Sequence, residues 1–253
     1  YARDAGVDDF VSLLPHLGWG EWEEFYRVAE RPDEIGLDRP FYPQRPGGAK
    51  REHLVEGLGV TAFGDLRRVC EWERKGQRAA APLFWTLGPQ QVGKAAISGW
   101  RDMLAPALRD PTLDVALWPF DGSLSRLLRP GRIVVAETYP AVYYQRLGLA
   151  TPVKKRQLAY RSAAWGALQA WMRCREIEAT AALVEIGKAG FGEEVGGEDG
   201  FDAVVGLLGM LDVVLGGRPE GTPADERVRR VEGWILGRPW EQAPGEPEDA
   251  PDA

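Results

Sequence analysis

Residues 133–140 read Ile133-Val134-Val135-Ala136-Glu137-Thr138-Tyr139-Pro140. Four consecutive apolar residues without polar alternation are typical of a strand buried on both faces, as in a parallel sheet covered by helices. Glu137 follows at the carboxyl end of this strand, where a buried charge is costly unless it is paired or bound to a metal. We therefore favour a functional role for Glu137. The alternatives are a salt bridge to Arg132 or Arg161, or a carboxylate already in solvent.

A second apolar run, Val115-Ala116-Leu117-Trp118, has the same character and predicts a neighbouring strand. It is followed by Trp118-Pro119-Phe120-Asp121-Gly122. Asp-Gly after a strand is common turn chemistry, and this interpretation is slightly favoured. The functional alternative is that Asp121 lies at the carboxyl end of a buried strand, where open α/β sheets keep their sites.

The rest of the chain predicts helices around these strands, which makes the fold class α/β with a mostly buried sheet flanked by helices. We expect one domain over residues 1–239 and a disordered acidic tail over residues 240–253, which is rich in Pro, Glu and Asp. The apolar spacing predicts helices at Asp8–Ala29, Lys50–Leu58, Gly64–Arg74, Lys94–Leu108, Lys154–Arg175, Glu178–Lys188 and Phe201–Leu215.

Charge and composition narrow the class of function. The net charge is -7, and the five acids of residues 241–253 account for most of it. The nearly neutral body has no field that would hold nucleic acid by charge alone, so such a contact would need local basic clusters. Two Cys and two His are too few for a CxxC-type zinc site. No apolar run approaches a membrane span and no signal-peptide pattern opens the chain, so we expect no membrane partner and a cytoplasmic location.

Residues 88–95 have the spacing of a phosphate-binding loop, Gly88-Pro89-Gln90-Gln91-Val92-Gly93-Lys94-Ala95. Ala95 stands where that motif needs a hydroxyl to bind magnesium, so we do not expect an NTPase. Lys94 and Gln91 could still face an anion from the start of a helix. With Arg39 and Arg45 of the turn-rich residues 31–48, they define an alternative function, a non-hydrolytic nucleotide- or phosphate-binding protein.

The stretch Gly200-Phe201-Asp202-Ala203-Val204 opens the last predicted helix. On helical spacing Asp202 shares a face with Gly206 and Gly209, which would allow a neighbouring element to approach closely and bring Asp202 near the sheet edge. The simpler interpretation is that Asp202 caps the helix, and it is favoured from this segment alone.

Three ordered motifs resemble a family of predicted ribonuclease H-like nucleases, domain of unknown function 429. They are Glu137-Thr138-Tyr139-Pro140 after a strand, Phe201-Asp202-Ala203 at a helix, and Glu232-Gly233-Trp234-Ile235 near the end. The resemblance extends over residues 1–238. It implies a ribonuclease H-like layered fold, and it leads us to expect that the family's N-terminal strands are missing from this chain.

The resemblance also implies a metal-dependent nuclease that hydrolyses phosphodiesters with two Mg²⁺ or Mn²⁺ ions, which carboxylates suit. Glu137 and Asp202 would be catalytic residues and metal ligands. Asp121 ranks third, because it has no firm counterpart in the family pattern. The partner implied is nucleic acid or a small phosphoester, and Lys94, Gln91, Arg39 and Arg45 are the candidate substrate-binding residues.

Overall fold

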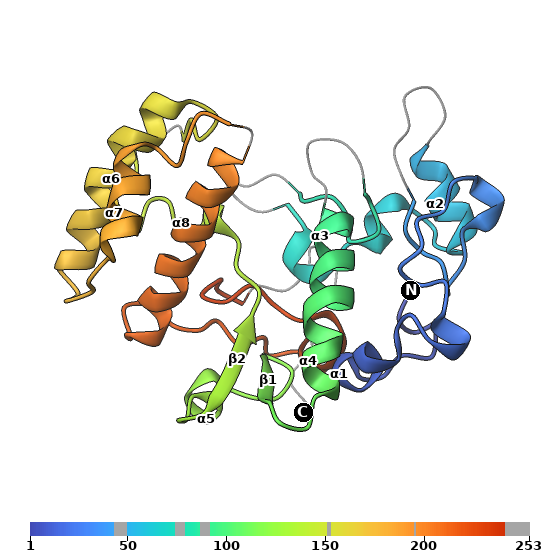
Figure 1. Ribbon diagram of the computed structural model, residues 1–253. Coiled ribbons are helices and arrows are strands. Elements are labelled where there is room, and N and C mark those ends of the chain that lie inside the picture. Colours follow the sequence, from blue (N-terminus) through green and yellow to red (C-terminus); the bar gives the residue numbers. More distant parts are fainter. Residues whose placement is uncertain (43–49, 74–78, 87–91, 151–152, 195, 241–253) are drawn as a thin grey trace, which may run out of the picture. The chain divides into compact units, whose positions relative to one another are not determined.

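A computed structural model describes residues 1–42, 50–73, 79–86, 92–150, 153–194 and 196–240 (Figure 1). The chain divides into two compact units. The first comprises Tyr1–Val135, Pro223–Trp234 and Trp240–Ala253, and the second comprises Ala136–Thr222 and Ile235–Pro239. The expected domain over residues 1–239 stays a prediction, and the expected tail lies outside the described residues apart from Trp240.

The two predicted strands are confirmed as neighbours. Strand β1 spans Asp114–Trp118 and pairs in parallel with β2, Arg132–Ala136, with the short helix α5 (Leu124–Leu127) between them in the chain. The last three residues of β1 are buried. The prediction that β2 is buried on both faces is wrong, because Ile133 is 50% exposed. In the described part of the chain the sheet has only two strands, and β2 stays partly exposed although its residues are continuously apolar.

The first unit is built mainly from short helical turns. They are α1 (Phe10–Leu13), η1 (Leu14–His16), η2 (Gly20–Trp22), η3 (Pro32–Glu34), α2 (Arg51–Gly57), η4 (Phe63–Leu66), η5 (Val69–Glu71) and the π-helix η8 (Val228–Glu232). The prediction of helix at Lys50–Leu58 is confirmed, whereas the long helix predicted over Asp8–Ala29 is wrong. Gly18 and Gly20 adopt φ values of 86° and 59°, and this left-handed backbone breaks a helix. In place of the helix predicted over Gly64–Arg74, the described residues form two separate 3₁₀ turns, and Arg74 lies outside the described residues.

One helical rod in the first unit agrees with the sequence. It runs through α3 (Val92–Gly99), the π-helix η6 (Trp100–Leu104) and α4 (Ala105–Arg109), as Figure 1 shows. Pro106 lies in the first turn of α4, and the widened π turn before it accommodates a residue that lacks an N–H. The rod packs on an aromatic-rich core that includes Leu14, Phe25, Phe41, Leu54, Phe84, Ile97 and Leu117.

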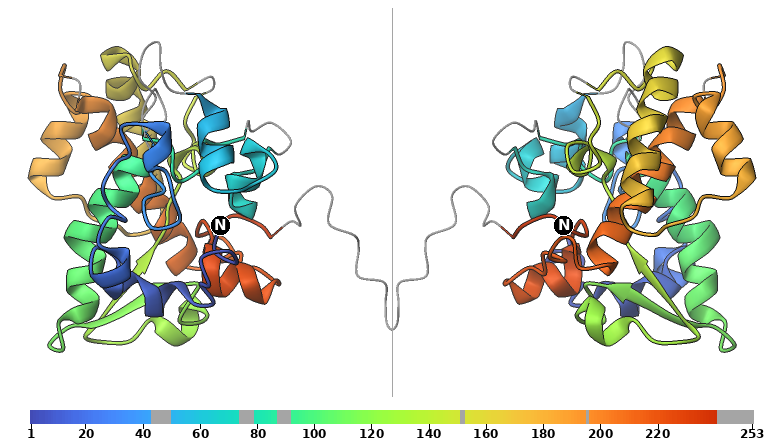
Figure 2. Two further views of the ribbon diagram at one scale, coloured as in Figure 1. Left: turned by 90° about the vertical axis from the view of Figure 1, so that its right-hand side faces the viewer. Right: turned by 90° about the vertical axis from the view of Figure 1, so that its left-hand side faces the viewer.

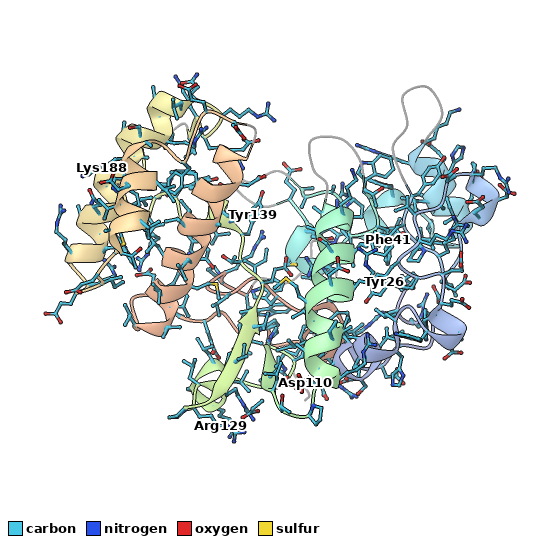
Figure 3. All side chains as sticks on the ribbon, in the orientation of Figure 1. Tyr26, Phe41, Asp110, Arg129, Tyr139 and Lys188 are labelled. Carbon is cyan, nitrogen blue, oxygen red and sulfur yellow. The ribbon has the colours of Figure 1, made fainter. Side chains whose placement is uncertain are left out.

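The second unit is a three-helix arrangement that Figure 2 shows from both sides. It consists of α6 (Leu158–Arg173), α7 (Ala181–Lys188) and α8 (Gly197–Val214), with the turn η7 (Pro140–Val142) packed on α8. All three helices are predicted by the sequence, but α8 begins earlier than expected. Their shared core includes Tyr143, Leu147, Trp165, Leu168, Phe201, Val205 and Leu208. Lys188 at the end of α7 and Tyr139 before η7 are labelled in Figure 3.

Within the described residues, no helix combines the length and the apolarity that a membrane span requires.

Candidate functional site

Asp202 lies inside α8 rather than at its start. The helix begins at Gly197, so the interpretation of Asp202 as its N-cap is wrong. Its side chain is 21% exposed and forms an ion pair with the Lys155 ammonium through Oδ2. The Tyr144 hydroxyl donates to Oδ1 at 3.1 Å. Burial raises the pKa of Tyr144 and the charge of Asp202 raises it further, so the phenol stays protonated and remains a donor.

Glu137 follows β2 and belongs to the same unit as Asp202. It is exposed, so the expectation of a buried charge at this position is wrong, and the alternative of a carboxylate in solvent agrees with the structure. Its backbone forms a parallel bridge with Ile235, and its carbonyl accepts from the Leu236 N–H at 2.9 Å. The next residue, Thr138, lies against α8, where a Cβ at Gly206 would be 3.1 Å from the Thr138 methyl. Because Gly206 and Asp202 are four residues apart on one helix, they lie on the same face one turn apart. The backbone after β2 is therefore next to the helix face that carries Asp202.

The close approach predicted from the two helix glycines is confirmed. At Gly209 a Cβ would overlap the ring of Tyr143, which is fully buried. At Gly206 the neighbour is Thr138. Both neighbours come from the segment that follows β2, so the two glycines allow that segment to pack closely on α8.

The two arginines considered as partners of Glu137 have other partners. Arg132 pairs with Asp114 at 2.9 Å, and hydrogen bonds from Arg132 and Arg129 hold the pKa of Asp114 below its usual value. Arg161 is buried and donates to the carbonyls of Lys155, Gly190 and Gly192 at 2.6–2.7 Å. Arg161 thus ties the segment before α6 to the segment before α8, a role that the sequence does not suggest.

Asp121 belongs to the first unit and closes a turn. Its Oδ2 accepts from the Leu117 N–H at 2.7 Å, and its own N–H donates to the Leu117 carbonyl at 2.9 Å. These bonds are the turn chemistry that the Asp-Gly pair predicts. The structure places Asp121 in a different unit from Glu137 and Asp202.

Of the residues predicted to bind phosphate, Gln91 and Arg45 lie outside the described residues. Lys94 is exposed in the first turn of α3. The preceding Gly93 donates its N–H to the Trp85 carbonyl at 3.0 Å, and a Cβ there would be 2.8 Å from the Leu83 carbonyl oxygen. Gly93 therefore allows α3 to pack closely against neighbouring backbone, and its N–H already donates a hydrogen bond to Trp85.

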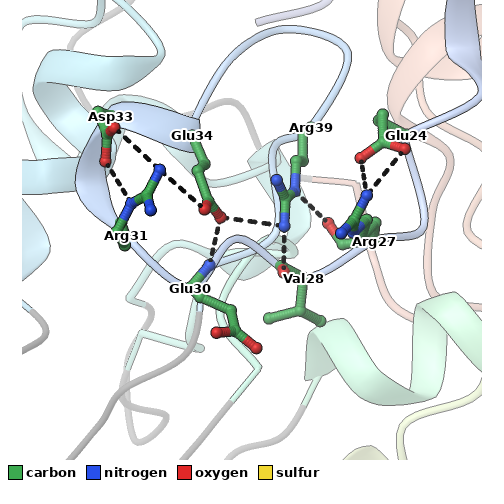
Figure 4. A network of polar contacts seen from close by, with 8 residues as sticks. All are labelled: Glu24, Arg27, Val28, Glu30, Arg31, Asp33, Glu34 and Arg39. Atoms are coloured by element: carbon green, nitrogen blue, oxygen red, sulfur yellow. Dashed lines mark hydrogen bonds and ion pairs between the residues drawn. The ribbon is translucent and has the colours of Figure 1, made fainter.

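Arg39 belongs to a polar network within residues 24–39 (Figure 4). It pairs with Glu34 at 3.0 Å and donates to the carbonyls of Val28 and Arg27 at 3.0 and 3.4 Å. A guanidinium with these three partners fixes the loop, which is a structural role.

Glu232 of the third motif is a partly buried carboxylate in the first unit. It accepts from the Val69 N–H at 2.7 Å, and its own carbonyl accepts from Arg68 at 3.3 Å. Burial raises the pKa of Glu232, although the Val69 bond and Arg68 act in the opposite direction. Gly233 follows with φ 73°, and a Cβ there would be 2.7 Å from the Phe120 ring.

The sequence gives no sign of the most deeply buried acid in the second unit. Asp212 of α8 is 1% exposed and lies between Arg146 and Arg175, at 3.2 and 3.0 Å. Its partners are 66 and 37 residues away along the chain, and no local motif connects them.

Asp202 is thus paired with Lys155 and accepts a hydrogen bond from Tyr144, and the segment that contains Glu137 and Thr138 packs on the same helix through Thr138. Across the ranges that the structure describes, there is no group of three or more His, Cys, Asp or Glu placed to hold a metal. Comparison of the chain with family models, with curated proteins and with solved structures found no match.

Proposed function

We propose that the chain carries part of a metal-dependent phosphodiester hydrolase of ribonuclease H-like architecture, with Glu137 and Asp202 as ligands of Mg²⁺ or Mn²⁺. One observation carries the proposal. Thr138 lies on Gly206, so the residue next to Glu137 lies one helical turn from Asp202. The contact brings the backbone after β2 close to α8 one turn from Asp202, and a strand end beside a long helix is the arrangement that the family resemblance implies.

The donor set suits a hard cation, because carboxylate oxygens are the ligands that Mg²⁺ and Mn²⁺ prefer. The Lys155 ammonium already pairs with Asp202, so a divalent ion would compete with it for this carboxylate. A bound divalent ion would supply an activated water and stabilise the leaving oxygen. In that arrangement the Tyr144 hydroxyl orients the Asp202 carboxylate, and Lys155 lies beside it as a positive charge for an anionic substrate.

The alternative, a phosphate-binding protein built on the start of α3, has less support. Phosphate-binding loops hold their ligand with free backbone N–H groups. The Gly93 N–H is bound to Trp85, and Arg39 is bound to Glu34 and to two carbonyls.

The test is cleavage of fluorescently labelled single-stranded RNA and DNA by the full chain, with Mn²⁺ and with EDTA. We expect Mn²⁺-dependent cleavage that Glu137→Gln and Asp202→Asn each abolish with the fold intact by circular dichroism. Asp199→Asn is the matched control, because Asp199 is an exposed acid of the same helix. Cleavage that is unchanged in both variants, or equal loss in Asp199→Asn, would refute the assignment.

A further inference from the structure

Three arginines gather at the end of α8 around one carboxylate. Arg146 donates through Nε and Nη2 to Asp212 Oδ2 at 3.4 and 3.2 Å, and also to the Gly217 carbonyl. Arg175 donates through Nη2 to Asp212 Oδ1 at 3.0 Å. Arg218 is the third member, and its guanidinium lies 5.7 Å from the centre of the Tyr143 ring. We call Arg146, Arg175 and Arg218 the arginine cluster.

The arginine cluster carries more charge than Asp212 needs. A single guanidinium neutralises a carboxylate, whereas here three cations surround one anion. Arg218 has no carboxylate within ion-pair distance in the described ranges, and its one hydrogen bond there goes to the Val142 carbonyl at 3.2 Å. Burial lowers the pKa of Arg218, and the charge of Arg146 acts in the same direction, whereas Tyr143 and Asp212 act against them. An excess of positive charge at a partly buried place is favourable only when an anion compensates it.

The arginine cluster also has N–H groups that make no hydrogen bond to the residues that the structure describes. A guanidinium has five N–H groups in a rigid fork that matches phosphate oxygens. Among the residues described, Arg175 donates only from Nη2 and Arg218 only from Nη1. The side chains of Arg146 and Arg175 are 49% and 30% exposed, so a ligand can reach them. Arg175 is also stacked on the Trp171 ring at 4.0 Å, which fixes the plane of its fork.

We propose that the arginine cluster binds a backbone phosphate of a nucleic acid, as a contact remote from the candidate metal ligands. The choice of nucleic acid rests on the proposed function. Asp202 and Asp212 are ten residues apart on α8, which is about 15 Å along the axis and about 80° around it. At roughly 3.4 Å of rise per nucleotide, the spacing of a stacked strand as in duplex DNA, that distance corresponds to about four nucleotides, and to fewer in a stretched single strand. A strand that reaches Asp202 can therefore place a later phosphate on the arginine cluster.

A purely structural role makes a different prediction. If the arginines only neutralise Asp212, replacing Arg218 has no effect on nucleic-acid binding, because Arg218 does not pair with that acid. If they form a phosphate site, the loss of either Arg175 or Arg218 weakens binding and makes it less sensitive to salt.

The experiment is fluorescence anisotropy of a labelled single-stranded oligonucleotide with the full chain, in EDTA and over a series of NaCl concentrations. Arg175→Lys keeps a positive charge beside Asp212 but removes the fork, and Arg218→Gln removes the third charge. The matched control is Arg173→Gln, at an exposed position of α6. Thermal unfolding of each variant confirms that it is folded, and vesicles with anionic lipid and inorganic phosphate are the competing ligands.

We expect Arg175→Lys and Arg218→Gln to weaken binding several-fold, with the salt slope of Arg218→Gln lower by about 0.7. Arg173→Gln should bind like the unmodified protein. Unchanged binding in both variants, equal loss in Arg173→Gln, or binding to vesicles or inorganic phosphate in place of the oligonucleotide would overturn the proposal. EDTA separates this result from the metal site. If Glu137→Gln and Asp202→Asn do not affect cleavage while the arginine variants still lose binding, the proposed function fails and the phosphate site stands.

Discussion

Thr138 lies directly against Gly206, where a Cβ would be 3.1 Å from its methyl group. This contact joins the end of β2 to α8 within the second unit and brings the residue after Glu137 beside the helix that carries Asp202. Three residues further along α8, Gly209 repeats the arrangement with Tyr143. The two glycines therefore allow the segment after β2 to pack closely on α8. The positions of both candidate ligands depend on this packing.

Gly209→Ala should destabilise the second unit, because its Cβ would overlap the buried Tyr143 ring. Overpacking of this kind costs about 1–3 kcal/mol. Gly166→Ala in α6 is the matched control, because a Cβ there meets nothing within 4 Å. At this helical position alanine should stabilise by about 0.5–1 kcal/mol. Urea unfolding measures both changes, and equal effects of the two substitutions would show that Gly209 is not a packing position.

Removing the Lys155 ammonium should strengthen the binding of a divalent ion to Asp202. Lys155 is paired with Asp202, so Lys155→Gln frees that carboxylate and should tighten Mn²⁺ binding several-fold. Lys154→Gln removes the same charge from the exposed neighbouring residue and should leave the affinity nearly unchanged. Isothermal titration calorimetry compares the three proteins. Weaker binding in Lys155→Gln than in Lys154→Gln would contradict the idea that the ammonium competes with the metal.

Asp212→Asn should be strongly destabilising. The substitution leaves two arginines beside a buried amide that cannot neutralise them, and breaking a buried ion pair from one side costs about 3–5 kcal/mol. The exposed acid of the same helix supplies the control, since Asp199→Asn should change the free energy of unfolding by less than about 0.5 kcal/mol. Chemical denaturation gives both values, and a small effect at Asp212 would mean that its burial carries no ion-pair energy.

Glu232 should make the protein less stable as the pH rises. Its pKa is raised in the folded state above the ordinary 4.5, so the folded chain holds this proton more tightly than the unfolded chain. Stability from this group is therefore gained as the pH falls from neutral toward 4.5 and lost as the pH rises through the raised pKa. Glu232→Gln keeps an oxygen for the Val69 N–H but cannot titrate. Thermal unfolding between pH 5 and pH 7 should vary less in Glu232→Gln, and identical profiles would contradict the assignment.

The sequence predicts elements whose signal is local and continuous. The apolar runs of β1 and β2, the rod through α3 and α4, and helices α6 and α7 are of this kind. The helix over residues 8–29 fails because Gly18 and Gly20 take left-handed backbone despite a helical spacing of aromatic residues. The early start of α8 is missed because the acidic glycine-rich stretch is typical of a loop. In the structure Gly197 is instead required by packing, with its Cβ position 2.5 Å from the Gly192 carbonyl oxygen.

Only part of the candidate site can be predicted from the sequence. The glycine face of α8 and the position of Glu137 after a strand follow from spacing. The partners of Asp202 do not, since Lys155 and Tyr144 come from segments 47 and 58 residues away. The burial of Asp212 likewise depends on arginines from distant segments. Charge pairs between residues far apart in the chain produce no periodic pattern that a single sequence would show.

The central claim is that Glu137 and Asp202 share a metal, and paramagnetic NMR tests it most directly. Mn²⁺ added below one equivalent to the ¹⁵N-labelled full chain broadens only amide signals close to the bound ion. We predict selective broadening at Glu137 and Thr138 and over residues 202–206, which Asp202→Asn abolishes and Asp199→Asn does not. Broadening centred elsewhere, such as on the acidic residues 241–253, or broadening that persists in Asp202→Asn, would contradict the account.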